Sequence, residues 1–259
     1  MRFLTDEGPE GRSGLCGIAI MAKASEPGKC KTRLVPPLTH DEAAALNTAF
    51  LTDIGANIAT CAEMAPIQGM TAYHPVGQEE FFHDVLPTDF RLVRPREPGL
   101  GRSLPHAARD ILNAGYGSMC LVNSDSPTLP KDYLIEAARV LALPGDRCVL
   151  GPAVDGGYYL IGLKRFHARL FEDIDWSTER VFAQTVARAE EIGLEISCLP
   201  NWYDVDDRET LTYLMRELFS PQDPGPYTGG NPAPRSRALL LDLQKIGLGA
   251  RLQAAEQTG

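Results

Sequence analysis

Short apolar segments alternate with longer amphipathic segments along most of this chain. The apolar segments have the length of buried strands and lie at residues 15–21, 67–73, 90–94, 118–122, 147–150, 158–163 and 194–199. The segments between them have the residue spacing of helices, at residues 43–58, 78–86, 104–114, 131–143, 177–193 and 207–219. Because strands that are joined through helices pair in parallel, this alternation predicts an α/β fold. We expect a mostly parallel sheet with helices on both faces.

One main domain accounts for most of the chain. Its 259 residues are 44% hydrophobic and 23% charged, which allows a substantial core. We assign this domain to residues 15–220. Residues 1–14 are polar and rich in turn formers, so we expect a tail there. Residues 221–259 begin with a linker rich in proline and glycine. They continue into a short helix at 238–248, which packs back on the domain or pairs with a second subunit in a homodimer.

Composition excludes several classes of protein. Residues 1–14 lack the apolar core of a secretory signal, and no apolar run is long enough to cross a bilayer, so we expect a cytoplasmic protein without a membrane span. The six cysteines are scattered without a C-x-x-C pair, which favours reduced core thiols over disulfides or zinc ligands. The formal charge of -9 argues against a nucleic-acid partner.

A basic loop follows the first predicted strand. Residues 21–34 carry four cations and one acid, and a Pro-Gly pair marks a turn there. Ligands of open α/β sheets bind outside the carboxyl ends of the strands, so this loop is where a nucleotide phosphate would lie. The nucleotide-binding candidates are Lys23, Gly28, Lys31 and Arg33. The loop does not complete the G-x-x-x-x-G-K-[ST] pattern. The alternative is a cluster of ordinary surface cations on a turn.

Two acids follow later strands. Asp125 comes directly after the buried strand 118–122, and magnesium bound with nucleotide phosphates usually takes one or two protein carboxylates. Asp207 is well placed to cap the helix at 207–219, which leaves Asp206 free to share a metal ion with Asp125. The sequence therefore predicts a site for Mg²⁺ or Mn²⁺ on Asp125 and Asp206. The alternative for Asp125 is a plain Asp-Ser-Pro turn.

A glycine-rich turn separates two further predicted strands. Gly156 and Gly157 let the backbone approach a ligand closely, and Asp155 can accept hydrogen bonds from sugar hydroxyls or act near the metal. The alternative is a simple connection between strands. Ser177 and Thr178 have a similar ambiguity, since they suit either a helix N-cap or a contact with substrate hydroxyls.

Five spaced motifs together resemble a known superfamily. They are M-A-K-x-x-x-P-G-x-x-K-T-R-L at 21–34, S-D-S-P-x-L-P at 124–130, L-G-P-A-x-D-G-G-Y-Y-L-I-G-L at 150–163, W-S-T at 176–178 and D-V-D at 204–206. Their order resembles the nucleotide-diphospho-sugar transferases. More narrowly, it is similar to a bacterial glycosyltransferase-like branch related to 2-phospholactate guanylyltransferase.

The resemblance implies a fold and roles for individual residues. The fold would be GT-A-like, a three-layer sandwich around a mostly parallel twisted sheet. The loop at 23–33 would bind the nucleotide phosphates, Asp125 would be the metal aspartate, and the terminal D-x-D pattern falls on Asp204 and Asp206. Asp155, with the two glycines after it, would line the pocket for the transferred group or its acceptor.

Three functions are compatible with these residues. The first is a metal-dependent glycosyl transfer from a nucleotide sugar to a small-molecule acceptor, with Asp155 as the base for the acceptor hydroxyl. The second is nucleotidyl transfer, in which a substrate phosphate attacks a nucleoside triphosphate and pyrophosphate leaves. The third is a nucleotide-binding protein without catalysis, which the presence of both Asp125 and Asp206 disfavours. The resemblance favours the first function.

Overall fold

The computed structural model describes residues 1–6, 8, 10–94, 100–220, 222 and 225–256. Within them, eight strands form one sheet in the order β1-β4-β3-β2-β5-β7-β6-β8. The strands are β1 (Arg2–Phe3), β2 (Cys16–Lys23), β3 (Ile67–His74), β4 (Arg91–Val93), β5 (Ser118–Val122), β6 (Arg147–Pro152), β7 (Tyr158–Leu163) and β8 (Glu195–Cys198). The helices are α1 (His40–Met64), α2 (Glu79–Val85), α3 (Leu100–Asn113), α4 (Lys131–Ala142), α5 (Val181–Glu191), α6 (Arg208–Phe219), α7 (Pro234–Lys245) and α8 (Leu248–Glu256).

The sheet is mostly parallel, as the sequence predicts. β2 pairs in parallel with β3 and β5, and β6 pairs in parallel with β8. Only β7 runs the other way, antiparallel to both of its neighbours. The reason is the short connection between β6 and β7, which is far too short for the crossover that parallel pairing requires.

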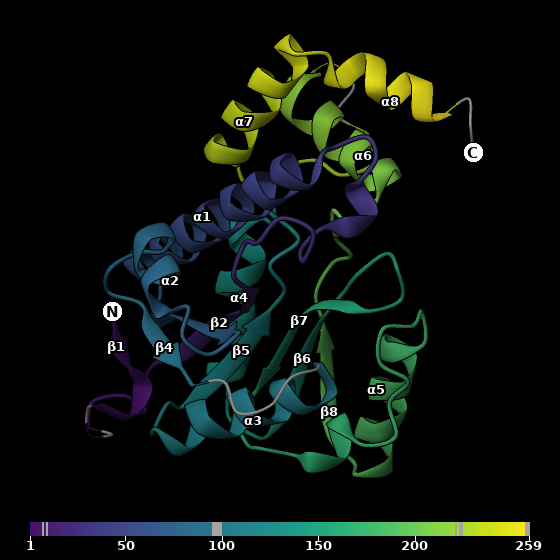
Figure 1. The fold of residues 1–259 in the computed structure, drawn as a ribbon. Coiled ribbons are helices and arrows are strands. Elements are labelled where there is room, and N and C mark those ends of the chain that lie inside the picture. Colours follow the sequence, from purple (N-terminus) through teal and green to yellow (C-terminus); the bar gives the residue numbers. More distant parts are fainter. Residues whose placement is uncertain (7, 9, 95–99, 221, 223–224, 257–259) are drawn as a thin grey trace.

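Helices cover both faces of the sheet, which gives the three layers predicted from the motif resemblance (Figure 1). Alternate residues of β2 face opposite layers, as the period of a strand requires. Ile18 and Ile20 belong to the core cluster that includes residues of α1 and α4. Ala19 belongs to the second cluster, which includes residues of α3 and α5. Both faces of this strand are therefore buried, as is usual for the central strands of a parallel sheet.

The chain ends differ from the expected tail and single helix. Strand β1 lies within residues 1–14 and pairs in parallel with β4. Arg12 is buried and donates hydrogen bonds to the carbonyl oxygens of Leu4 and Ala114, each at 3.2 Å. At the other end, α7 starts at Pro234, earlier than predicted, and α8 follows it. Part of the linker predicted from residue 221 lies outside the described residues.

Two helix starts are set by local side-chain and backbone features. Thr39 and Glu42 form the capping box of α1: the Thr39 Oγ1 accepts from the Glu42 amide at 3.2 Å, and Glu42 Oε2 accepts from the Thr39 amide at 2.8 Å. The start of α5 was predicted at residue 177 and lies at Val181 instead. Ser177 has a left-handed backbone with φ 64°, which a helix cannot accommodate. Residues 177–180 form a turn that opens toward the site described below.

All six cysteines are free thiols. No helix in the described part of the chain has the length and apolar character needed to span a bilayer.

Candidate functional site

A cleft of about 620 Å³ opens at the carboxyl ends of β2 and β5. Its walls come from the loop after β2, the segment after β5, the turn between β6 and β7, and the segments before α5 and α6. Nine of the residues predicted for the site line it: Lys23, Lys31, Arg33, Asp125, Asp155, Gly157, Ser177, Thr178 and Asp206. Gly28 and Gly156 shape turns beside it. The structure thus gathers segments that are up to 183 residues apart in sequence, from Lys23 to Asp206.

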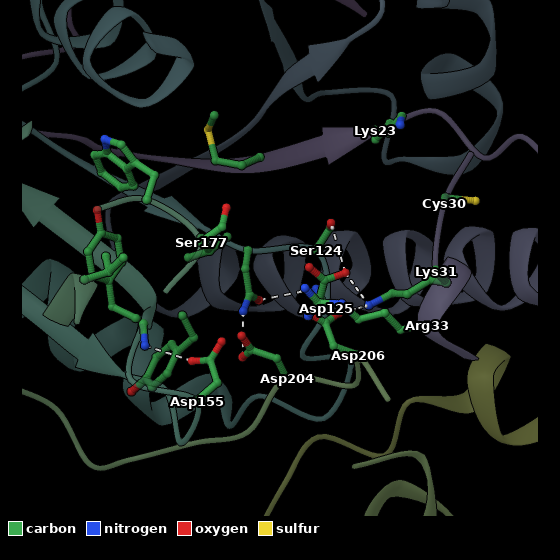
Figure 2. Close-up of a pocket in the computed structure, with 18 of the residues that line it drawn as sticks. Lys23, Cys30, Lys31, Arg33, Ser124, Asp125, Asp155, Ser177, Asp204 and Asp206 are labelled. Carbon is green, nitrogen blue, oxygen red and sulfur yellow. Dashed lines mark hydrogen bonds and ion pairs between the residues drawn. The ribbon is translucent and has the colours of Figure 1, made fainter. Parts of the chain in front are cut away.

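The charged groups of the cleft are arranged along its length. Figure 2 shows a basic end, an acidic middle and a mixed far end, formed in turn by Lys23, Lys31 and Arg33, by Asp125, Asp204 and Asp206, and by Asp155 and Ser177. The basic end suits an anionic group, and the acidic middle suits a cation.

Asp125 and Asp206 meet at the ammonium group of Lys31. The Lys31 Nζ lies 2.5 Å from Asp125 Oδ1, 2.9 Å from Asp206 Oδ1 and 2.6 Å from the carbonyl oxygen of Val205. A backbone hydrogen bond of 2.8 Å from the Val205 amide to the Asp125 carbonyl joins the two acidic segments. Burial lowers the pKa of Lys31, but the carboxylates of Asp125 and Asp206 outweigh it and hold this pKa above its usual value. Lys31 therefore binds the acidic pair as a cation.

The two carboxylates suit a Mg²⁺ or Mn²⁺ ion, which the motif resemblance implies here. Both aim an oxygen at one point that a cation, the Lys31 ammonium, already occupies. Carboxylate oxygens are the protein ligands that these hard cations prefer. No group of three or more histidine, cysteine, aspartate or glutamate side chains in the described residues is arranged to hold a metal ion. An ion held by these two carboxylates would need further ligands from outside the protein.

Asp204 has a different environment from Asp206, although both belong to the D-x-D motif. Its Oδ1 accepts hydrogen bonds from Asn123 Nδ2 at 2.8 Å and from Ser126 Oγ at 3.1 Å. Burial, together with repulsion from the neighbouring aspartates at 125, 155 and 206, raises the pKa of Asp204 to about 7. Asp204 thus links residues on either side of Asp125, namely Asn123 and Ser126, through hydrogen bonds. Asp206, in contrast, contacts the Lys31 ammonium together with Asp125.

Asn123 is a site residue that the sequence analysis missed. Its amide nitrogen donates to Asp204, and its Oδ1 accepts from the Asp125 amide at 3.3 Å. It therefore fixes the backbone that presents Asp125. A signal was available, since Asn123 is the first residue after the strand that leads to Asp125.

The basic loop is held in shape by its own polar groups. Lys23 Nζ donates to the carbonyl oxygen of Lys29 at 2.7 Å, which closes the loop. Asn47 of α1 donates from Nδ2 to the Lys23 carbonyl at 3.3 Å. Gly28 has φ 76° at the tip, a left-handed turn that glycine adopts without strain. Arg33 is exposed in the cleft, and the described residues offer its guanidinium no hydrogen-bond or ion-pair partner. It is the cation best placed to meet a phosphate.

The turn at 153–157 is locked against the segment before α5. Asp155 Oδ1 accepts a hydrogen bond from the Gly157 amide at 2.8 Å, which fixes the carboxylate in the turn. Gly156 has φ 87°, and a Cβ there would lie 2.1 Å from the carbonyl oxygen of Glu179. The amide of Phe182 donates to the Gly156 carbonyl at 2.9 Å. The structure therefore gives Gly156 a packing role, while Asp155 and Gly157 line the cleft.

Residues 176–178 form the far end of the cleft. The hydroxyl of Thr178 donates to the carbonyl oxygen of Asp175 at 2.7 Å and accepts from the Arg180 amide at 3.3 Å. Neither Ser177 nor Thr178 is the N-cap of α5, which is Arg180. Trp176 was quoted in the motif but not predicted as a site residue. It lines the cleft and lies on Gly101, where an added Cβ would come within 2.6 Å of its ring.

Comparisons with known proteins agree with this architecture. Residues 57–178 match the model of a family described as "Uncharacterized protein conserved in bacteria (DUF2064)". No curated protein matches the chain. A crystal structure of a "putative nucleotide-diphospho-sugar transferase from Desulfovibrio desulfuricans G20" is 28% identical, with a TM-score of 0.75 over 92% of this chain and 97% of that one.

A more distant structure shares the fold alone. The 4-diphosphocytidyl-2C-methyl-D-erythritol synthase of Anaerococcus prevotii DSM 20548 is 10% identical, with a TM-score of 0.50 over 79% of this chain and 98% of that one. The α/β fold predicted from the sequence is therefore confirmed. The chain is similar over nearly its whole length to a protein described as a nucleotide-diphospho-sugar transferase, the superfamily that its motifs resemble.

Proposed function

We propose that this chain is a transferase that uses a nucleotide sugar as donor and a small molecule as acceptor. The observation that carries the proposal is the convergence of Asp125 and Asp206 on one cation, in a cleft with a basic loop on one side and Asp155 on the other. The similarity to a protein described as a nucleotide-diphospho-sugar transferase, at 28% identity, supports the same class of donor.

The basic loop would bind the diphosphate of the donor. Arg33 faces the cleft with an uncommitted guanidinium, and a guanidinium can form two parallel hydrogen bonds to a phosphate. Lys23 lies at the start of the same loop. Its hydrogen bond to the Lys29 carbonyl oxygen holds the loop closed. The overall charge of -9 would repel an anion, so local cations are needed to bind one.

Asp125 and Asp206 would hold a Mg²⁺ or Mn²⁺ ion beside the diphosphate. Such an ion, when bound, neutralises charge that develops on a departing nucleoside diphosphate. Asn123 accepts a hydrogen bond from the Asp125 amide and donates one to Asp204, which holds the backbone that presents Asp125. The chain itself would supply one carboxylate oxygen from each of Asp125 and Asp206.

Asp155 would act as the base in the transfer. The acceptor oxygen bonds to the anomeric carbon, the bond from that carbon to the phosphate oxygen breaks, and the nucleoside diphosphate leaves with the electron pair. The proton of the acceptor hydroxyl passes to the carboxylate of Asp155. The hydrogen bond from the Gly157 amide uses Oδ1, which leaves Oδ2 for the acceptor.

The assignment of Asp125 and Asp206 is tested by binding. We expect Asp125→Asn and Asp206→Asn each to abolish the Mn²⁺-dependent part of nucleoside diphosphate binding in calorimetry, with an unchanged circular dichroism spectrum. Asp242→Asn, on the exposed face of α7, is the matched control and should bind as the wild type does. If Asp206→Asn keeps normal Mn²⁺ dependence while Asp204→Asn loses it, the wrong acid of the motif has been assigned.

A further inference from the structure

We propose that Lys31 is an internal cation that holds the metal position in the empty protein and moves to the nucleotide phosphates when a divalent ion arrives. This inference rests on the proposed function, because it needs the metal site of Asp125 and Asp206. It adds an exchange of cations that couples metal binding to nucleotide binding.

The ammonium group of Lys31 is fully engaged by protein oxygens. A lysine ammonium has three N–H donors, and three acceptors lie at 2.5, 2.6 and 2.9 Å from the Nζ. The side chain is 3% exposed although it lines the cleft. In this arrangement no donor of Lys31 is available to a phosphate. The simple role predicted from the sequence, a phosphate-binding lysine, therefore requires the ammonium to leave its present partners.

A divalent ion and the Lys31 ammonium compete for the same carboxylate oxygens. Asp125 Oδ1 and Asp206 Oδ1 both point at the Nζ, so an ion bound by this pair would lie where the ammonium lies now. An ion at this position and an ammonium still beside it would repel each other strongly in a partly buried site. The ion carries twice the charge of the ammonium, so the carboxylates favour it once it is present.

The lysine can move without disturbing the backbone of the loop. Its ammonium sits at the end of a flexible stem of four carbons. Lys31 is next to η2 (Thr32–Leu34), which carries Arg33 into the same cleft. An ammonium released from the acidic pair therefore stays beside Arg33, where the phosphates are expected. The centroid of the Phe50 ring lies 5.3 Å from the Nζ, within the range of a cation–π contact in the present position.

The exchange predicts how the two ligands affect each other. With no metal present, the nucleotide meets a loop whose Lys31 is occupied by carboxylates. With metal bound, the ammonium lacks an anionic partner, and a phosphate supplies one. Metal and nucleotide therefore bind with positive coupling, and because coupling is reciprocal, each raises the affinity of the other by the same factor.

The first test removes the internal cation. We expect Lys31→Met to bind Mn²⁺ alone at least about tenfold more tightly than the wild type, because the competing charge is gone. The variant should also lose most of the coupling between Mn²⁺ and a nucleoside diphosphate. Free Mn²⁺ is followed by electron paramagnetic resonance and the nucleotide by calorimetry. Lys245→Met, which removes an exposed lysine paired with Asp242, is the control. Equal or weaker Mn²⁺ binding by Lys31→Met would overturn the exchange.

The second test uses the wild type and does not depend on the stability of a variant. Acylation of lysine amines, read by mass spectrometry, should spare Lys31 in the metal-free protein. Mg²⁺ alone should expose Lys31 to the reagent, and Mg²⁺ with a nucleoside diphosphate should protect it again. Lys245, whose side chain is 65% exposed, should be labelled equally in all three samples. Continued protection of Lys31 with Mg²⁺ alone would show that the ammonium does not leave.

Failure of this inference differs from failure of the proposed function. If Mn²⁺ binding requires Asp125 but neither test shows displacement of Lys31, the metal site stands and the exchange is wrong. If no sample binds Mn²⁺, with or without nucleotide, the metal site itself is wrong and the exchange falls with it.

Discussion

At the scale of residues, the site depends on how carboxylates are paired with cations. Asp125 and Asp206 could be predicted from the sequence because each follows a strand at the edge where ligands bind. Their contact with Lys31 could not, because Lys31 and Asp206 are 175 positions apart and only the folded sheet brings them together. Lys31 was therefore predicted from the sequence as a phosphate ligand, but in the structure it forms ion pairs with Asp125 and Asp206.

The raised pKa of Asp204 predicts a pH dependence of stability. Its pKa is about 7 in the folded protein against an ordinary value of 3.8, so the folded state favours the neutral form. The contribution to the free energy of unfolding is complete below about pH 4 and is lost as the pH rises through 7. Asp204→Asn should therefore be more stable than the wild type at pH 8, by roughly 1–3 kcal/mol, with no such advantage at pH 4.

Urea unfolding of both proteins at pH 4, 6 and 8 measures this difference, with Asp242→Asn as a control for an exposed acid. A constant difference between Asp204→Asn and the wild type across this range would contradict the raised pKa.

At the scale of elements, turns set the geometry of the cleft more than helices do. Strands and helices were predictable from hydrophobic period, and the capping boxes at Thr39 and Asp207 fix the starts of α1 and α6 one residue later. The start of α5 was misplaced by four residues because Ser177 and Thr178 have the chemistry of caps. The left-handed backbone of Ser177 and the packing of the 153–157 turn decide the local structure, and neither leaves a hydrophobic pattern.

Gly156 gives the test at this scale. Gly156→Ala combines a left-handed φ of 87° with a Cβ placed 2.1 Å from the Glu179 carbonyl oxygen. We expect a loss of roughly 2–5 kcal/mol in the free energy of unfolding, from backbone strain and overpacking together. Gly193→Ala is the matched control: its φ is 65°, but no atom lies within 4 Å of the added Cβ, so only the strain applies. Equal losses in the two variants would show that the turn is not locked against Glu179.

At the scale of the whole molecule, the C-terminal helices are part of the main body. Asp53, buried in α1, accepts hydrogen bonds from the amides of Arg235 and Ser236 and from the Ser236 hydroxyl, at 3.0, 2.7 and 2.6 Å. A carboxylate at a helix N-terminus is favourable because the unpaired amides there carry partial positive charge. The sequence could not reveal this cap, since the acid and the helix it caps are 182 residues apart.

Removing this carboxylate should loosen α7 selectively. We expect Asp53→Ala to cost roughly 2–4 kcal/mol, because it leaves buried amides without an acceptor. Hydrogen exchange should accelerate in residues 234–245 more than in residues 118–122 of the central sheet. Asp242→Ala removes an exposed acid of α7 and should cost little. Unchanged exchange in α7 of the Asp53 variant would contradict the role of this cap.

The proposed reaction is tested most directly by the identity of the phosphate product. The purified protein is incubated with Mg²⁺ or Mn²⁺, a panel of nucleotide sugars and nucleoside triphosphates, and candidate acceptors. The account predicts release of a nucleoside diphosphate from a nucleotide sugar, with loss of turnover in Asp125→Asn. Asp155→Asn should keep donor binding but lose turnover, because an amide cannot accept the proton. Pyrophosphate release from a triphosphate, dependent on a phosphorylated co-substrate and lost in Asp125→Asn, would contradict it and establish nucleotidyl transfer.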